Sequence, residues 1–97
     1  KTLAVMFYDK QSDNNIIYMG MNMYWEKLEF TLPKLANMDW YLFADTSKSA
    51  PYDITEPGRE ILLKNQSKIN IDARSVVILI GKKKYQAQSN FIQDGSL

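Results

Sequence analysis

The sequence contains no cysteine and no histidine. Without cysteine the chain has no disulfide, no thiolate metal ligand and no thiol nucleophile. Without histidine it lacks the commonest general base and zinc ligand, which excludes Ser-His-Asp and Cys-His catalytic arrangements. The 4 glycines are scattered singly, so there is no glycine-rich phosphate-binding loop. We therefore predict that this chain is not itself an enzyme and holds no cofactor.

The charge is balanced and long apolar runs are absent. Lysine and arginine number 12 against 11 aspartates and glutamates, a net charge of +1, which gives no reason to expect a nucleic acid or an anionic membrane as partner. No apolar run approaches the roughly 20 residues of a membrane helix. The first residues enter strand-like sequence directly, without an initiating methionine, so we expect no signal peptide. We expect a cytoplasmic piece of a longer protein.

The carboxylates offer few metal or catalytic sites. Asp53, Glu56 and Glu60 are the best calcium candidates, but they lack the dense ligand spacing of an oxygen-rich metal loop. The other acids lie at predicted turns or, like Glu29, on the solvent side of a predicted strand. A glycosidase-type carboxylate pair is therefore not evident. We predict no metal site.

Apolar residues recur with the period of a β-strand along most of the chain. Between residues 28 and 32, Leu28, Phe30 and Leu32 alternate with polar residues, as in a strand with one buried face. Pro33 ends this pattern because proline donates no ladder hydrogen bond. Similar patterns predict strands over 3–9, 15–23, 40–45, 68–73 and 75–81, with a long irregular segment over 46–58. Residues 60–64 fit either one helical turn or a short strand, and we favour the strand.

These spacings predict one all-β domain, a single antiparallel Greek-key β-sandwich of about seven or eight strands. The domain spans residues 1–84, and residues 85–97 form a weak last strand or a flexible tail. Residues 75–81 are continuously apolar, which predicts a central strand covered on both faces. Trp40 is also assigned to the core. The alternation assigns the remaining core to Val5, Phe7, Ile17, Met19, Leu28, Phe30, Leu32, Leu42, Ile69, Ile71, Val76, Ile78 and Ile80.

A polar and aromatic corner precedes the strand at 28–32 and resembles a hairpin turn between two strands. It contains Asn22, Tyr24, Trp25 and Glu26. Adjacent aromatic rings beside polar groups stack against sugar rings, which predicts a carbohydrate contact. The same rings also pack against a protein's own core or a neighbouring domain, and we favour packing. These four residues are the candidate carbohydrate or interdomain contact.

Three segments of the chain resemble, in order, the C-terminal β-domain of bacterial glycogen-debranching and isoamylase-type enzymes of the α-amylase superfamily. Residues 21–33 are similar to the pattern Asn-Ala-x-Trp-Glu-x-Leu-x-Phe-x-Leu-Pro, through Asn22, Trp25 and Glu26 and the residues that follow. Residues 40–46 end in Ala-Asp-Thr, near the family's Leu-Asp-Thr. Residues 69–79 contain Ala-Arg-Ser-Val-Val at positions 73–77, close to the family's Ala-Arg-Ser-Val-Val-Val-Leu. Lys27 and Ala44 depart from the family's common proline and leucine.

The resemblance implies a non-catalytic accessory domain that braces a (β/α)8 barrel, which cleaves α-1,6 linkages in glycogen or a related α-glucan. The catalytic residues of such a barrel are not in this chain. The alternative is a glucan-binding module that uses exposed aromatic residues. We also expect several large aromatic side chains to cluster on one exposed surface that pairs two copies of the chain; the candidates are Tyr8, Tyr18, Tyr24, Trp25 and Phe43.

Overall fold

A computed structural model describes residues 1–8 and 16–84, and within these residues every regular element is a β-strand. No helix in this part of the chain is long and apolar enough to cross a membrane. The predicted weak strand or tail at 85–97 lies outside the described residues. The strands are β1 (Thr2–Tyr8), β2 (Ile16–Asn22), β3 (Leu28–Thr31), β4 (Met38–Asp45), β5 (Ile61–Leu62), β6 (Lys68–Ile71) and β7 (Ser75–Lys83).

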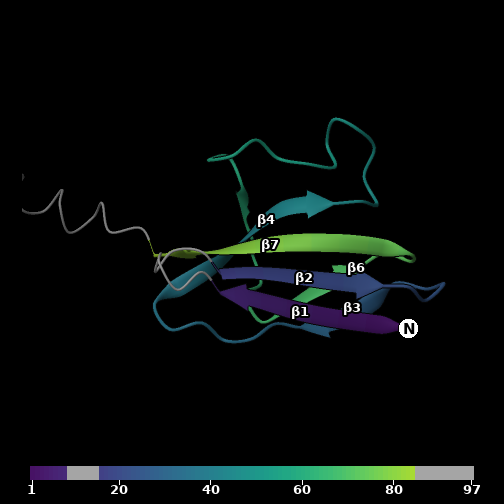
Figure 1. Cartoon of the computed structure of the whole chain (residues 1–97), viewed down its shortest axis with the longest axis horizontal. Helices are drawn as coiled ribbons and strands as arrows, with labels where there is room; N and C mark the ends of the chain where they lie inside the picture. Colours follow the sequence, from purple (N-terminus) through teal and green to yellow (C-terminus); the bar gives the residue numbers. More distant parts are fainter. Residues whose placement is uncertain (9–15, 85–97) are drawn as a thin grey trace, which may run out of the picture.

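The strands form two antiparallel sheets of unequal size. The larger sheet has the order β1-β2-β7-β4-β5, and the smaller one pairs β3 with β6. Figure 1 shows β1, β2 and β7 side by side, with β3 and β6 behind them. The last strand, β7, inserts between β2 and β4, so neighbours in the sheet are distant in sequence, as Greek-key connections produce. The predicted sandwich and the central place of β7 are confirmed.

The core lies between the two sheets. The larger sheet contributes Tyr18, Trp40, Val77 and Leu79, which are all nearly inaccessible to solvent. The smaller sheet and the residue after β3 contribute a second layer, Phe30, Leu32 and Ile71. The Trp40 ring meets Tyr18 edge-on, with centroids 5.8 Å apart, and burial raises the pKa of Tyr18. The core assignments of Trp40, Phe30, Leu32 and Ile71 are confirmed.

The predicted core was wrong for three strands of the larger sheet, because the opposite face of each packs inward. Phe7 and Ile17 are 50% and 38% exposed, whereas Tyr18, expected at the surface, is 3% exposed. Both faces of β2 and β7 are apolar, so a period of two does not reveal which one meets the second sheet. The other residues assigned to the wrong face are half-buried on the side away from the core; they are Val5, Met19, Val76, Ile78 and Ile80.

The glycine at position 20 is the sequence feature that identifies the inner face of β2. A Cβ atom there would lie 2.7 Å from Cδ1 of Ile71, so a side chain at this position would collide with the second sheet. Glycine in a strand marks such close approach of another layer. Tyr18 and Asn22 share the face of Gly20 because side chains alternate along a strand.

Candidate functional site

The predicted corner connects the two sheets rather than forming a hairpin. β2 pairs with β1 and β7, while β3 pairs only with β6, so the hairpin expectation was wrong. Asn22 holds this corner and is fully buried. Its Nδ2 donates to the carbonyl oxygens of Glu26 at 2.8 Å, Ile71 at 3.0 Å and Asp72 at 3.1 Å. Its Oδ1 accepts a hydrogen bond from the backbone N–H of Tyr24 at 2.9 Å.

The amide of Asn22 is therefore committed to the protein's own main chain, and its observed role is to fasten the corner to the end of β6. The other three residues of the predicted contact face outward to different degrees. Trp25 is 64% exposed, Tyr24 is half-buried and Glu26 is exposed. The Tyr24 and Trp25 rings lie 5.5 Å apart, tilted by 46°. Their role as a carbohydrate or interdomain contact stays a prediction.

The expected cluster of aromatic residues on one surface was wrong, while the pairing of two copies stays a prediction. Tyr18 is in the core, and Tyr8 and Trp25 lie toward opposite ends of β2. Tyr8 pairs with Ile16 at the start of that strand, whereas Trp25 follows its last residue. Aromatic character alone did not predict whether a side chain lies in the core or at the surface, because each ring has a different local environment.

The exposed apolar surface is instead the outer face of the larger sheet. Directly paired residues of neighbouring strands point to the same side of a sheet. Leu3, Met21 and Val76 form one such row, and Val5, Met19 and Ile78 form the next. A third row runs across all five strands through Phe7, Ile17, Ile80, Tyr41 and Leu62. We call the residues of these rows the outer face.

The outer face contains no charged residue and remains accessible to solvent. Leu3, Phe7 and Leu62 are each at least half exposed, and Ile17 is 38% exposed. An antiparallel sheet with one wet face ordinarily shows polar residues there. A contiguous apolar surface of this kind marks an interaction site. Sequence reasoning assigned most of these residues to the core and so missed the site, although the repeated apolar residues on both faces of residues 16–22 and 75–81 signalled it.

One partly buried ion pair borders the outer face. Lys82 follows Ile80 by two positions in β7, and its Nζ lies 2.6 Å from Oε1 of Glu60 and 5.2 Å from the centre of the Tyr41 ring. The Glu60 side chain is 5% exposed and also accepts a hydrogen bond from the backbone N–H of Gly58. The hydrogen bond from Lys82 lowers the pKa of Glu60, outweighing the opposing effect of burial. Glu60 is thus held ionised and ties the end of the 46–60 segment to β7.

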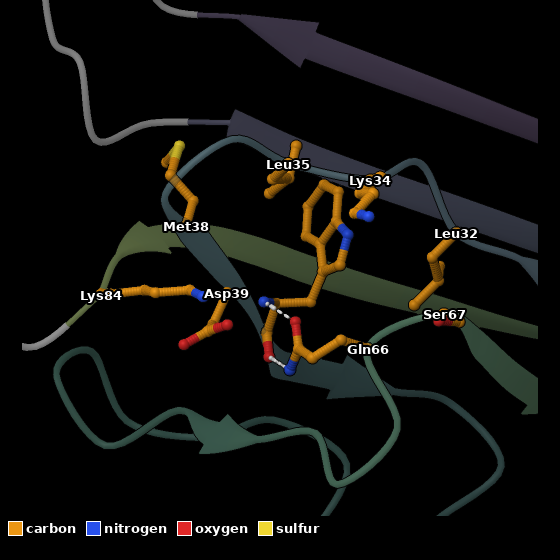
Figure 2. A pocket seen from close by; sticks show the side chains of 9 residues that line it. Leu32, Lys34, Leu35, Met38, Asp39, Gln66, Ser67 and Lys84 are labelled. Carbon is orange, nitrogen blue, oxygen red and sulfur yellow. Dashed lines mark hydrogen bonds between the residues drawn. The ribbon is translucent and has the colours of Figure 1, made fainter.

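A cavity of about 300 Å³ lies on the other side of β4, beside the β3–β4 connection (Figure 2). Figure 2 shows the Gln66 side chain bridging the backbone of Trp40, with its Nε2 donating to the Trp40 carbonyl at 3.0 Å. Gln66 also donates to the carbonyl of Leu63 at 2.9 Å. Its amide is therefore occupied by the main chain. Asp39 is the one carboxylate that lines this cavity, so no acid pair converges there.

No constellation of catalytic groups gathers in the part of the chain that the structure describes. Among residues 1–8 and 16–84, no group of three carboxylates is placed to hold a metal ion. The main feature is a two-layer sandwich whose larger sheet has an exposed apolar outer face. Together, the fold and this surface are those of a β-domain with an exposed apolar interaction surface.

The comparison with family models places the chain in a particular group. Residues 1–88 match the model of the isoamylase 1-3 C-terminal domain. The chain therefore belongs to this family of isoamylase C-terminal domains, and it is an accessory domain of a debranching-type glycoside hydrolase. The resemblance carried by residues 21–33, 40–46 and 69–79 is confirmed. No curated protein matches the chain in sequence.

Proposed function

We propose that this domain braces the catalytic (β/α)8 barrel of its parent debranching enzyme by seating the outer face of the larger sheet against it. The parent enzyme hydrolyses α-1,6 branch linkages of glycogen or a related α-glucan, and this domain contributes no catalytic residue. The observation that carries the proposal is the uncharged, solvent-accessible outer face. Burying it against the barrel removes apolar surface from water, which is favourable.

The outer face extends across the whole width of the larger sheet. The outer face spans all five strands in its longest row. Neighbouring strands lie about 4.8 Å apart, so the row extends across roughly 20 Å of sheet. The smaller sheet has no such surface, because Glu29 and Lys68 form an exposed ion pair on its outer side at 3.4 Å.

Ile17→Glu in the parent enzyme tests the proposal. The side chain is 38% exposed in this domain, so its replacement should cost the isolated chain about 1 kcal/mol. If the outer face is seated on the barrel, the carboxylate is buried there without a partner. The free energy of unfolding of the enzyme should then fall by about 3 kcal/mol or more. Chemical denaturation of the chain and of the enzyme gives both values.

Thr31→Glu is the matched control, because Thr31 is exposed on β3 and pairs with Lys68. We expect it to change neither stability by more than about 0.5 kcal/mol. An equal loss for Ile17→Glu in the chain and in the enzyme would contradict docking through the outer face.

A glucan-binding module is the rival function, and the exposure of Trp25 is the observation that favours it. The 46° tilt between Tyr24 and Trp25 argues against one flat stacking platform for a sugar. Saturable maltoheptaose binding that Trp25→Ala abolishes would support the module instead of the brace.

A further inference from the structure

The cavity beside the β3–β4 connection is built from four segments that are far apart in sequence. Its volume is about 300 Å³, at the lower end of the range for ligand sites, so it suits a molecule about as large as a monosaccharide. Figure 2 shows the segments that form its walls, which are 32–35 after β3, 38–40 at the start of β4, 66–67 before β6, and Lys84 after β7. None of the lining residues belongs to the rows of the outer face, so the cavity is separate from the docking surface.

Hydrogen bonds between the walls fix the shape of the cavity. The backbone N–H of Leu32 donates to the carbonyl of Ser67 at 2.8 Å, and the backbone N–H of Lys84 donates to the carbonyl of Asn37 at 3.2 Å. The Gln66 side chain bonds in turn to the backbone of β4. Each wall is therefore tied to a neighbouring wall. A site that is shaped before its ligand arrives loses little entropy on binding, and most small-molecule sites are of this kind.

Three charged side chains that line the cavity form no ion pair with any residue that the structure describes. They are Lys34, Asp39 and Lys84. Asp39 lies opposite Lys82 in the register of β4 and β7, but the Lys82 ammonium pairs with Glu60 instead, at 2.6 Å. The two lysines are exposed and the aspartate is half-buried. The cavity therefore offers two cations and one carboxylate to a ligand.

These polar groups lie toward two ends of the cavity. Figure 2 shows the Lys84 side chain reaching toward Asp39 at one end, whereas Lys34 and Ser67 lie toward the other end. An ammonium group beside a carboxylate offers a hydrogen-bond donor and an acceptor together, which suits the hydroxyl groups of a sugar. An ammonium group beside a serine hydroxyl, away from the carboxylate, suits an anion such as phosphate. The two ends thus differ in the chemical group that each would bind.

We propose that this cavity binds a phosphorylated monosaccharide. The phosphate, with a charge of about −1.5 to −2 and three acceptor oxygens, contacts the Lys34 ammonium and the Ser67 hydroxyl. The sugar hydroxyls bond to Asp39 and Lys84, which keeps the phosphate away from the carboxylate. Apolar side chains that also line the cavity cover the C–H groups of the sugar; these are Leu32, Leu35 and Met38. The inference rests on residues outside the outer face, so it holds with or without the proposed function.

Titration of the isotope-labelled chain with glucose 6-phosphate, followed by NMR, tests the proposal. The ionic strength is held constant, because salt screens exposed charges. We expect saturable shifts of the backbone amides of Lys34, Asp39 and Ser67, with a dissociation constant on the order of 1 mM. Glucose and inorganic phosphate each make only part of the contacts, so each should bind at least about tenfold more weakly. Inorganic phosphate that binds as tightly as glucose 6-phosphate would overturn the proposal, because the cavity would then recognise an anion without its sugar.

Asp39→Ala separates the sugar contact from the anion contact, because the carboxylate affects the two ligands in opposite directions. Its removal takes a hydroxyl acceptor from the sugar, so glucose 6-phosphate should bind about fivefold more weakly. The same change removes a negative charge, so inorganic phosphate should bind more tightly, by about a factor of two. Circular dichroism verifies that the variant keeps the strand content of the natural chain.

Lys34→Gln should weaken both glucose 6-phosphate and inorganic phosphate, because it removes the charge that holds the phosphate group. Lys48→Gln is the matched control, since Lys48 is an exposed lysine of the 46–58 segment that does not line the cavity, and it should change neither affinity. Equal effects of Lys34→Gln and Lys48→Gln overturn the proposal. Tighter binding of both ligands to Asp39→Ala does so too, as does an absence of saturable shifts in the natural chain.

Discussion

Replacing Trp40 by alanine is expected to lower the free energy of unfolding by about 3–5 kcal/mol. The side chain is 1% exposed and is the largest among the fully buried ones. Its removal opens a cavity between the sheets, deletes the edge contact with Tyr18 and leaves the carbonyl of Pro33 without its indole donor at 3.0 Å. A domain with a total stability of about 5–15 kcal/mol is severely weakened by such a loss. Urea denaturation followed by circular dichroism measures it.

Trp25→Ala is the matched control, because the same chemical change is made at a side chain that is 64% exposed. We expect an effect within about 0.5 kcal/mol. If Trp40→Ala does not fold, Trp40→Phe keeps an aromatic ring in the core and loses the hydrogen bond to Pro33. That variant should cost about 1–3 kcal/mol. Similar losses at positions 25 and 40 would contradict the assigned core.

Asn22→Ala is expected to cost about 2–4 kcal/mol, because several buried polar groups lose their partner together. The carbonyls of Ile71 and Asp72 lose a donor, and the N–H of Tyr24 loses an acceptor. Asn22→Asp separates the contribution of the amide as a donor from its contribution as an acceptor. It keeps an acceptor for Tyr24 but brings a carboxylate against carbonyl oxygens, so we expect a loss at least as large as that of Asn22→Ala.

Asn70→Ala provides the control for Asn22, since Asn70 is exposed on β6 in the same corner of the molecule. Its loss should stay within about 0.5 kcal/mol. Thermal and urea unfolding of the three variants, compared at equal protein concentration, gives the differences. An effect of Asn22→Ala no larger than that of Asn70→Ala would show that the corner is not held by this amide.

For strands with polar residues on their solvent face, the sequence predicted both where the strand lies in the chain and which face is buried. Glu29 and Thr31 mark the wet side of β3, and Asn70 does so for β6, so Phe30 and Ile71 were placed in the core. β1, β2 and β7 have no polar side that marks the solvent. Their inner and outer faces were therefore exchanged. The error came from the apolar outer face, on which the proposed docking rests, since a surface that a partner buries has the composition of a core.

The role of Asn22 was also beyond the reach of local sequence patterns. The residue was singled out as part of a candidate contact, but two of its main-chain partners lie 49 and 50 residues further along the chain. Only the meeting of the two sheets brings these carbonyls to the amide. The position of Trp40 was easier to predict from the sequence, because a large apolar side chain on a strand with an apolar inner face is favourably placed in the core.

Methionine oxidation gives the most direct test of the account's central claim, that the outer face is seated on the catalytic barrel. Met19 and Met21 lie on the outer face, while Met6 and Met38 are half-buried elsewhere and serve as internal controls. Oxidation by peroxide follows the exposure of the sulfur. The account predicts that Met19 and Met21 oxidise severalfold more slowly in the parent enzyme than in the chain alone, with Met6 and Met38 unchanged. Equal rates for Met19 and Met21 in the chain and in the enzyme would contradict it.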